Sequence, residues 1–340
     1  MSTNVQDVLI SVKGLKKYFK VKGKGMLHAV DGIDFDIYPG ETLGLVGESG
    51  CGKSTVGNVL LKLKDRTAGE MIYKGQDVFT ANKKDSFELC KKIQIIFQDP
   101  YSSLNPRKTI RSILKESFEI HKIAKGEELD ARIKELCADT GLSEDLLNKY
   151  PHELDGGKRQ VVGIARALSL SPEFIVCDEP VSSLDVSIQA TIINLLMDLQ
   201  EKRGISFLFI SHDLSVVRHI SNRIAVMYLG EIIEMASTDT IFENAFHPYT
   251  IALLSAVPKV EIGKKVSRIV LKGDVASPIN PVEGCRFATR CWMSEEICTQ
   301  KSPKLETVGE GHSVACHFYK ESRRLASEAE AERESSERVQ

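Results

Sequence analysis

Residues 47–55 have the sequence GESGCGKST, which matches the phosphate-binding pattern G-x-x-x-x-G-K-[ST]. Glycines at these spacings let backbone N–H groups turn inward around phosphate oxygens at the start of a helix. Within this pattern Lys53 reaches the β- and γ-phosphates and Ser54 is a Mg²⁺ ligand. The motif therefore predicts a nucleotide phosphate site built by Gly47, Glu48, Ser49, Gly50, Cys51, Gly52, Lys53, Ser54 and Thr55.

Two carboxylates end the apolar run FIVCDE at residues 174–179. Asp178 is placed to hold Mg²⁺ through the coordination shell of the ion, and Glu179 could polarise an attacking water. Without other motifs, an acidic strand end facing solvent would explain this pair. Beside a phosphate loop, the pair predicts hydrolysis of a nucleotide phosphate.

Short apolar runs and helical patterns alternate around these motifs. Strand-like runs lie at residues 9–15, 29–47, 174–179, 205–212 and 223–230, and helical patterns lie at 54–63, 107–170 and 188–200. Strands that alternate with helices indicate an α/β core with a parallel sheet. The long helical stretch interrupts that core as an insertion.

Composition narrows the class of protein. The chain has 340 residues, of which 42% are apolar and 27% charged, and its formal net charge is −2. This balance shows no bulk attraction for nucleic acid, so no nucleic-acid partner is expected. The sequence contains neither a secretory signal pattern nor an apolar run near the roughly 18 residues that span a bilayer. We expect a cytosolic protein whose membrane role, if any, comes through partners.

Four further motifs give the chain a family resemblance. They are Gln98 in IIFQDP, LDGGKRQ at residues 154–160, SSLD at 182–185, and His212 in FISHD. In order and spacing, residues 8–245 resemble the nucleotide-binding subunits of ABC transporters. The four motifs resemble, respectively, the Q-loop, the signature, the D-loop with Asp185, and the switch histidine of that family.

The resemblance implies roles for these residues. Tyr18 would stack on adenine, with neighbouring Phe19 as a possible substitute. Gln98 would contact Mg²⁺ and the attacking water, and would link the nucleotide to a helical region that docks on a membrane subunit. His212 would hold the γ-phosphate and position Glu179. The implied site thus contains ATP and Mg²⁺, the metal being held by Ser54, Gln98 and Asp178.

The C-terminal third resembles a narrower group. HPYTIALLSAVP at residues 247–258, followed by a cysteine-rich segment, is similar to the extension of oligopeptide and dipeptide importer ATPases. This resemblance implies an ABC nucleotide-binding domain at 1–245 with β-rich and helical subdomains, the latter at about 100–170. It further implies an extension at 246–320 and a charged tail at 321–340.

The implied function is to energise the import of di- or oligopeptides from the cytoplasmic face of the cell membrane. The expected partners are a second ABC ATPase subunit, two transmembrane permease subunits and a solute-binding protein. One alternative is a related importer for nickel or another small solute. Others are a soluble ABC ATPase that acts on ribosomes or DNA, and a regulatory, nearly non-catalytic module.

The signature departs from the family pattern. Asp155 stands where the family usually has serine, and Lys158 stands where glutamine is common. Gly156 and Gly157 lie between them. In head-to-tail ATPase pairs the signature completes the partner's phosphate site. Aspartate is a good helix N-cap, but when ionised it cannot donate a hydrogen bond to a γ-phosphate. We expect the chain to be one half of a heterodimer in which the composite site with Asp155 is slow, and Lys158 offsets part of the repulsion between Asp155 and the phosphate. The alternative is natural variation, or an engineered substitution, without a regulatory purpose.

Four of the eight cysteines gather near the C-terminus, at Cys285, Cys291, Cys298 and Cys316. Their spacing matches neither C-x₂-C zinc pairs nor the common ferredoxin run, although four thiolates can hold zinc or a [4Fe–4S] cluster. The family resemblance favours the cluster, zinc is the alternative, and disulfides would need an oxidising setting. The remaining cysteines, Cys51, Cys90, Cys137 and Cys177, are expected to be packing residues.

Overall fold

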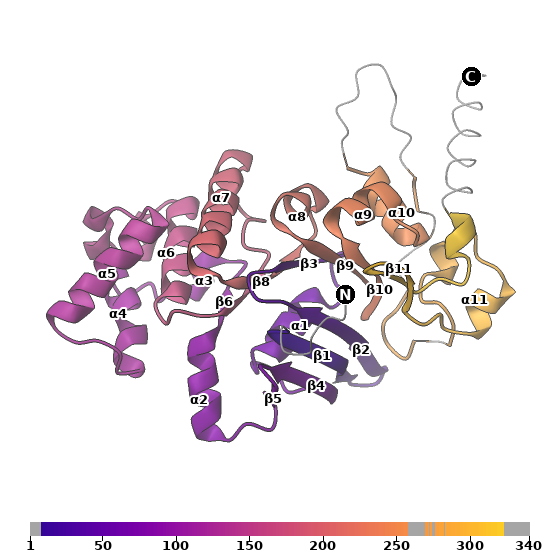
Figure 1. Ribbon diagram of the computed structural model, residues 1–340, viewed down its shortest axis with the longest axis horizontal. Coiled ribbons are helices and arrows are strands. Elements are labelled where there is room, and N and C mark those ends of the chain that lie inside the picture. Colours follow the sequence, from indigo (N-terminus) through magenta and orange to yellow (C-terminus); the bar gives the residue numbers. More distant parts are fainter. Residues whose placement is uncertain (1–7, 258–268, 272, 274–275, 282, 323–340) are drawn as a thin grey trace, which may run out of the picture.

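Two β-sheets carry the fold of the computed structural model, which describes residues 8–257, 269–271, 273, 276–281 and 283–322 (Figure 1). The larger sheet has the strand order β11-β12-β10-β9-β3-β8-β7-β6. Its five strands from β9 to β6 pair in parallel, whereas β10, β12 and β11 continue it antiparallel. The strands are β3 (Thr42–Val46), β6 (Ile93–Ile96), β7 (Phe174–Asp178), β8 (Ser206–Ser211), β9 (Arg223–Tyr228), β10 (Glu231–Ser237), β11 (Glu306–Gly309) and β12 (His312–Val314).

The parallel part of this sheet confirms the predicted α/β core. All residues of β3 and β8 are buried, as expected for strands covered on both faces. The smaller sheet is antiparallel with the order β2-β1-β4-β5 and forms the β-rich subdomain. Its strands are β1 (Ile10–Val21), β2 (Gly25–Ile37), β4 (Ala68–Tyr73) and β5 (Gln76–Asp77).

Helices gather at the end of the molecule opposite the C-terminal region (Figure 1). This helical region comprises α3 (Pro100–Ser103), α4 (Ile110–Ile120), α5 (Glu127–Thr140), the 3₁₀ helices η2 (Glu144–Asn148) and η3 (Pro151–Glu153), and α6 (Gly156–Leu168). The other helices are α1 (Lys53–Leu60), α2 (Lys83–Lys92), α7 (Val186–Arg203), α8 (Leu214–Ile220), α9 (Thr238–Asn244), α10 (Pro248–Ser255), η4 (Ala288–Arg290) and α11 (Glu296–Gln300). Helix α2 was not predicted from the sequence. None of its residues is fully buried, and Leu89 packs against the core while remaining only partly buried.

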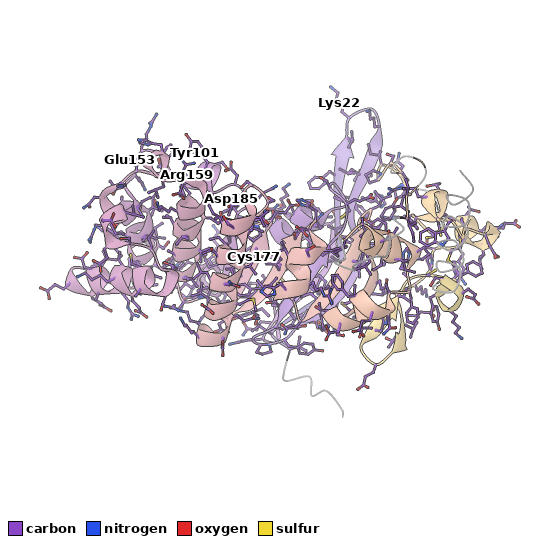
Figure 2. The ribbon with its side chains drawn as sticks, turned by 90° about the horizontal axis from the view of Figure 1, so that it is seen from above. Lys22, Tyr101, Glu153, Arg159, Cys177 and Asp185 are labelled. Atoms are coloured by element: carbon purple, nitrogen blue, oxygen red, sulfur yellow. The ribbon has the colours of Figure 1, made fainter. Side chains whose placement is uncertain are left out.

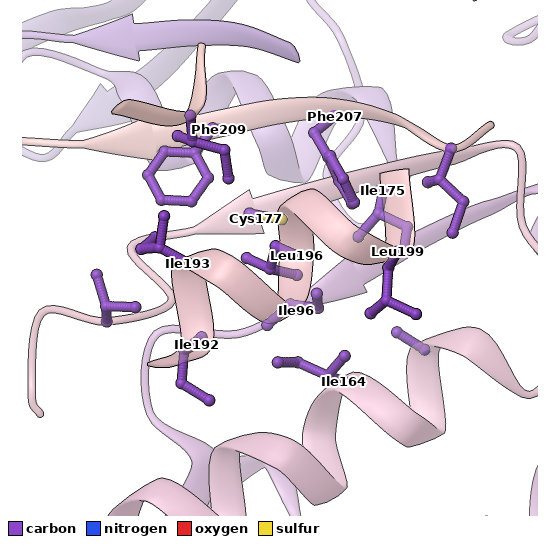
Figure 3. Packing of buried hydrophobic residues seen from close by; sticks show 14 of the residues in the cluster. Ile96, Ile164, Ile175, Cys177, Ile192, Ile193, Leu196, Leu199, Phe207 and Phe209 are labelled. Carbon is purple, nitrogen blue, oxygen red and sulfur yellow. The ribbon is translucent and has the colours of Figure 1, made fainter. Parts of the chain in front are cut away.

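One apolar core joins the helical region to the central sheet. Ile164 of α6 and Leu196 of α7 pack over Ile175 of β7 and Phe207 of β8 (Figure 3). Cys177 is fully buried in the same cluster, and Cys51 and Cys137 are also buried, as predicted for packing residues. Cys90 is exposed on α2, so its expected packing role was wrong.

The C-terminal region is built into the core rather than appended to it. Strand β12 pairs with β10 through Glu234 opposite Val314. Fully buried Glu234 accepts hydrogen bonds from the backbone N–H of Phe246 at 2.6 Å and of His247 at 3.0 Å, and its Oε1 lies 2.8 Å from His312 Nε2. One carboxylate therefore ties β10, the start of α10 and β12 together. From residue 323 onward, the expected charged tail lies outside the described residues.

Candidate nucleotide-binding and hydrolysis site

The predicted phosphate loop connects β3 to α1 and lines a cavity of about 540 Å³. Gly52 precedes α1 with φ at 112°, and a Cβ there would lie 2.0 Å from the carbonyl oxygen of Ala29. Only glycine fits this backbone. No side chain caps α1, so its first N–H groups are available to an anion.

Lys53 is buried at the first turn of α1. Its Nζ donates to the carbonyl oxygens of Gly47 at 2.7 Å and of Glu48 at 3.0 Å. The ammonium group is thus held by the same loop whose N–H groups would bind phosphate. This places the positive charge of the motif at the cavity, which Lys53 also lines.

The two predicted Mg²⁺ ligands from separate motifs are in contact. The Ser54 hydroxyl donates to Oδ1 of Asp178 at 2.8 Å, which joins the start of α1 to the end of β7. Burial raises the pKa of Asp178, neighbouring Glu179 raises it further, and the hydrogen bond from Ser54 lowers it in part. A divalent cation here would stabilise the ionised carboxylate, so the donor set fits Mg²⁺.

Three predicted catalytic side chains meet at one oxygen. Gln98 Nε2 donates to Glu179 Oε2 at 3.1 Å, and His212 Nδ1 lies 3.1 Å from the same oxygen. All three residues line the cavity of the phosphate loop. Glu179 has φ at 47°, a left-handed backbone that is uncommon for a non-glycine residue and is held by its N–H bond to Ile210 O at 3.0 Å.

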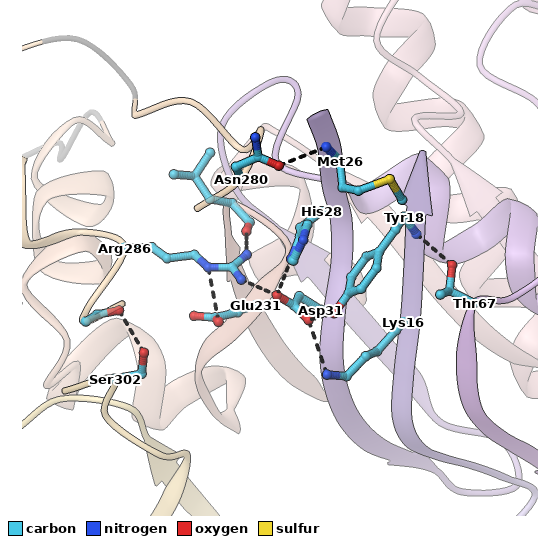
Figure 4. A network of polar contacts seen from close by, with 12 residues as sticks. Lys16, Tyr18, Met26, His28, Asp31, Thr67, Glu231, Asn280, Arg286 and Ser302 are labelled. Atoms are coloured by element: carbon cyan, nitrogen blue, oxygen red, sulfur yellow. Dashed lines mark hydrogen bonds and ion pairs between the residues drawn. The ribbon is translucent and has the colours of Figure 1, made fainter. Parts of the chain in front are cut away.

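The aromatic wall of the cavity differs from the expectation. Phe19, Leu27 and His28 line it, but Tyr18 does not. Tyr18 instead donates its hydroxyl to Asp31 and stacks on His28 with the ring centroids 3.9 Å apart (Figure 4). Neighbouring residues of a strand point to opposite faces, so only one member of the Tyr18–Phe19 pair can face the cavity. The sequence offered no means to choose between them.

The cavity is also lined by residues that were not predicted from the sequence. His28 and Ala29 come from β2, Leu229 follows β9, and Pro278 comes from the C-terminal region. None belongs to a recognisable motif. They reach the site only because the smaller sheet and the C-terminal region fold against the phosphate loop.

The signature residues lie away from this cavity, on the helical region. Asp155 caps α6 by accepting a hydrogen bond from the backbone N–H of Lys158 at 2.8 Å. Lys158 Nζ also lies 3.0 Å from Asp155 Oδ2, and both side chains are more than half exposed. These contacts with Lys158 lower the pKa of Asp155, which favours its ionised form. Asp185 caps α7 in the same way, accepting from the N–H of Ile188.

The four C-terminal cysteines line one small cavity together with mainly apolar residues, among them Phe287 and Met293. Burial raises the pKa of Cys285 to about 11 and the pKa values of Cys291 and Cys316 to about 12, and the neighbouring thiols add to each increase. Within the described residues, however, no three or more His, Cys, Asp or Glu side chains are arranged to hold a metal ion. The four thiols are the donor type of a cluster and share one cavity, but as placed among the described residues they do not form the predicted cysteine-ligated metal site.

Comparisons with known proteins show the family of the chain. Residues 30–182 match the ABC transporter family model, and residues 233–298 match the model of the oligopeptide/dipeptide transporter C-terminal region. The oligopeptide transport ATP-binding protein AppF of Bacillus subtilis is 48% identical over 94% of this chain and 100% of its own. This chain belongs to the ATP-binding subunits of oligopeptide/dipeptide ABC transporters.

Other similar proteins support the same family. The dipeptide transport ATP-binding protein DppF of Haemophilus influenzae is 46% identical over 91% of this chain and 96% of its own. Among solved structures, the ATP-binding cassette MJ0796 bound to ADP and Pi has a TM-score of 0.62 at 28% identity, covering 67% of this chain and 98% of that one. CbiO1 from Clostridium perfringens, described as part of the ABC transporter complex cbiONQ, has a TM-score of 0.61 at 27% identity, covering 70% and 92%.

Membership of this family makes the chain an ATPase that hydrolyses ATP to power transport. It also sets the chain apart from the soluble ABC ATPases considered as an alternative, because the match extends through the transporter-specific C-terminal region. Among the described residues of this transporter ATPase, no helix has both the length and the hydrophobicity needed to cross a membrane.

Proposed function

We propose that this transporter ATPase energises uptake of di- or oligopeptides by hydrolysing ATP in the cavity of its phosphate loop. The observation that carries the proposal is the convergence of Gln98 and His212 on Glu179 Oε2 at the wall of that cavity. A carboxylate held by two polar side chains next to a phosphate site can orient a water molecule and accept its proton.

The main residues of the site have the following proposed roles. Lys53 and the N–H groups of the loop would bind the β- and γ-phosphates. Ser54, Gln98 and Asp178 would hold Mg²⁺, which neutralises charge on the phosphates. Glu179 would take the proton of the attacking water, and His212 would hold the γ-phosphate. Phe19 replaces Tyr18 as the proposed platform for adenine, because Phe19 lines the cavity.

The proposed assembly is a heterodimer of ABC ATPases docked on two permease subunits at the cytoplasmic face of the membrane, supplied by a solute-binding protein. Tyr101 follows the Gln98 segment, is 55% exposed, and has the Arg159 guanidinium 5.0 Å from its ring centre (Figure 2). Arg159 belongs to α6, the signature helix. The exposed Tyr101 ring and the half-buried Arg159 support a docking face that contacts both the chain after Gln98 and the signature helix.

The proposed heterodimer contains one slow site. Asp155, ionised and paired with Lys158, would face the γ-phosphate bound by the partner's phosphate loop. The other composite site would use Lys53, Asp178 and Glu179 of this chain and would be the active one. The exposed position of Asp155 at the start of α6 supports this arrangement.

An uptake assay in cells tests which solute is transported. Cells that lack this chain are supplied with the wild type or with Glu179→Gln, and uptake of labelled dipeptides, longer peptides and nickel is measured. Peptide uptake restored by the wild type alone supports the proposal. Restoration of nickel uptake without peptide uptake would instead favour the small-solute alternative.

A [4Fe–4S] cluster, or Zn²⁺ as the alternative, remains a separate proposal for Cys285, Cys291, Cys298 and Cys316. Its support is that the four residues line one cavity. Its proposed role is to stabilise the fold of the short C-terminal region. Purification without oxygen, followed by assays of iron, sulfide and zinc, tests it. About four irons and four sulfides per chain would indicate the cluster, one zinc would indicate a closed clamp, and neither metal would reject both.

A further inference from the structure

We propose that the C-terminal region forms part of the ATP site, and that Arg286 and Arg290 are positioning residues for nucleotide binding. Arg290 holds the phosphate loop, and Arg286 holds the strand that forms the adenine side of the cavity. The inference rests on the proposed placement of ATP in that cavity.

Arg290 forms a two-pronged ion pair with the phosphate loop. Its Nη1 lies 2.8 Å from Glu48 Oε2 and its Nη2 lies 3.0 Å from Glu48 Oε1. The Arg290 side chain is 8% exposed and that of Glu48 29%, so water screens this pair only weakly. Two parallel bonds from a planar guanidinium fix the orientation as well as the position of a carboxylate.

A second contact from the C-terminal region holds the main chain of the same loop residue. The backbone N–H of Glu48 donates to the hydroxyl of Tyr249 at 2.8 Å. Tyr249 is fully buried near the start of α10, where His247 caps the helix by accepting from the N–H of Tyr249. The carbonyl oxygen of Glu48 in turn accepts from Lys53 Nζ. A shift of Glu48 would therefore move a partner of Lys53.

Arg286 makes the corresponding contacts at the other side of the cavity (Figure 4). It donates to Asp31 of β2 and lies 3.1 Å from Glu231 through its Nε. Asp31 Oδ2 is also 2.9 Å from Nδ1 of His28, which lines the cavity. The backbone N–H of His28 donates to the carbonyl oxygen of Pro278, another residue that lines the cavity, at 3.0 Å.

The two arginines are four residues apart. Arg286 comes shortly before η4, Arg290 is its last residue, and the flanking positions are Cys285 and Cys291. One short segment of the C-terminal region thus reaches both the phosphate side and the adenine side of the site. Neither arginine lines the cavity. They would act on ATP through Glu48 and through Asp31.

Removal of the Arg290 guanidinium is expected to weaken ATP binding. Without Arg290, the carboxylate of Glu48 would keep its negative charge beside the site of a polyanionic ligand, and the loop would lose its fixed orientation. Both changes weaken ATP binding. A lost hydrogen bond to a charged group corresponds to a change on the order of tenfold in the dissociation constant.

The test measures binding of a fluorescent N-methylanthraniloyl ATP with Mg²⁺ to the full chain. Arg290→Gln is expected to raise the Kd on the order of tenfold, and Arg290→Lys, which keeps the charge but loses the fork, to give an intermediate value. Adding Glu48→Gln to Arg290→Gln should cause no further loss, because the two residues act as one unit. In the assembled transporter, the KM for ATP should rise more than kcat falls.

Two controls separate the possible failures. Arg111→Gln removes an exposed ion pair with Asp130 on the helical region and should leave the Kd unchanged. Lys53→Ala should abolish binding. Normal binding by Lys53→Ala would reject the placement of ATP itself.

If Lys53→Ala fails to bind the ATP analogue while the Kd of Arg290→Gln is within twofold of the wild-type Kd, the positioning role of Arg290 is wrong. Additive losses from the Glu48 and Arg290 substitutions would overturn it as well. Melting temperatures show whether each variant is folded. If Arg290→Gln does not fold, Arg290→Lys decides the matter, since a wild-type Kd for that variant overturns the proposal.

Discussion

Glu179 Oε2 lies 3.1 Å from His212 Nδ1 and 3.1 Å from Gln98 Nε2, so residues from three separate motifs share one carboxylate oxygen. The three come from the segment after β6, the end of β7 and the end of β8. Parallel strands β6, β7 and β8 lie side by side and bring their carboxyl ends to one edge of the sheet.

Replacing Glu179 with glutamine should lower ATP turnover on the order of a hundredfold or more, because the amide cannot accept the proton of the attacking water. ATP binding should persist, since the phosphate loop is untouched. Single-turnover hydrolysis and nucleotide affinity, measured on the same preparation, check both parts. Full turnover in this variant would mean that another group serves as the base.

Replacing Phe19 with alanine should weaken ATP binding about tenfold, the loss expected for one base–aromatic stacking contact. Phe19→Tyr should bind normally because it keeps the ring. Tyr18→Phe is the matched control, as it removes only the hydroxyl that bonds Asp31. A larger loss with Tyr18→Ala than with Phe19→Ala would return the adenine role to Tyr18.

Replacing Asp155 with serine should raise ATP turnover of the assembled transporter. An ionised carboxylate about 4 Å from a phosphate charge costs about 4 kcal/mol at an effective dielectric constant of 20, and serine both removes that charge and donates a hydrogen bond. Steady-state turnover of the two complexes gives the comparison. Unchanged turnover would count against a slow composite site.

Replacing Glu234 with alanine should lower the free energy of unfolding by about 3–5 kcal/mol, because buried His312 and two N–H groups would lose their acceptor. Glu234→Gln should cost less, since its amide oxygen still accepts a hydrogen bond. Chemical denaturation provides the measurement. Glu116→Gln, which breaks an exposed pair with Lys108, is the control and should change stability by no more than about 0.5 kcal/mol. Equal effects at positions 234 and 116 would contradict the prediction.

The local sequence determined most of the central strands and helices and the positions of the motifs. Glycine at position 52, an apolar run ending in Asp178 and Glu179, and alternating strand and helix patterns depend on backbone sterics and on burial, which act over a few residues. These patterns predicted the α/β core and the phosphate loop. The family resemblance supplied the prediction that His212 positions Glu179, whereas the contact of Gln98 with Glu179 came only from the structure.

Only the tertiary structure decided what reaches the site from a distance. Phe19 rather than Tyr18 faces the cavity because the smaller sheet presents that face of β1 to the phosphate loop. Arg290 meets Glu48 across 242 positions of the chain, and β12 joins the central sheet through β10. Contacts of this kind follow from how whole elements pack. The residues next to an arginine in a proline-rich segment do not indicate which distant residue it will contact. For the same reason, four cysteines could be recognised as a group, while their arrangement around one cavity could not.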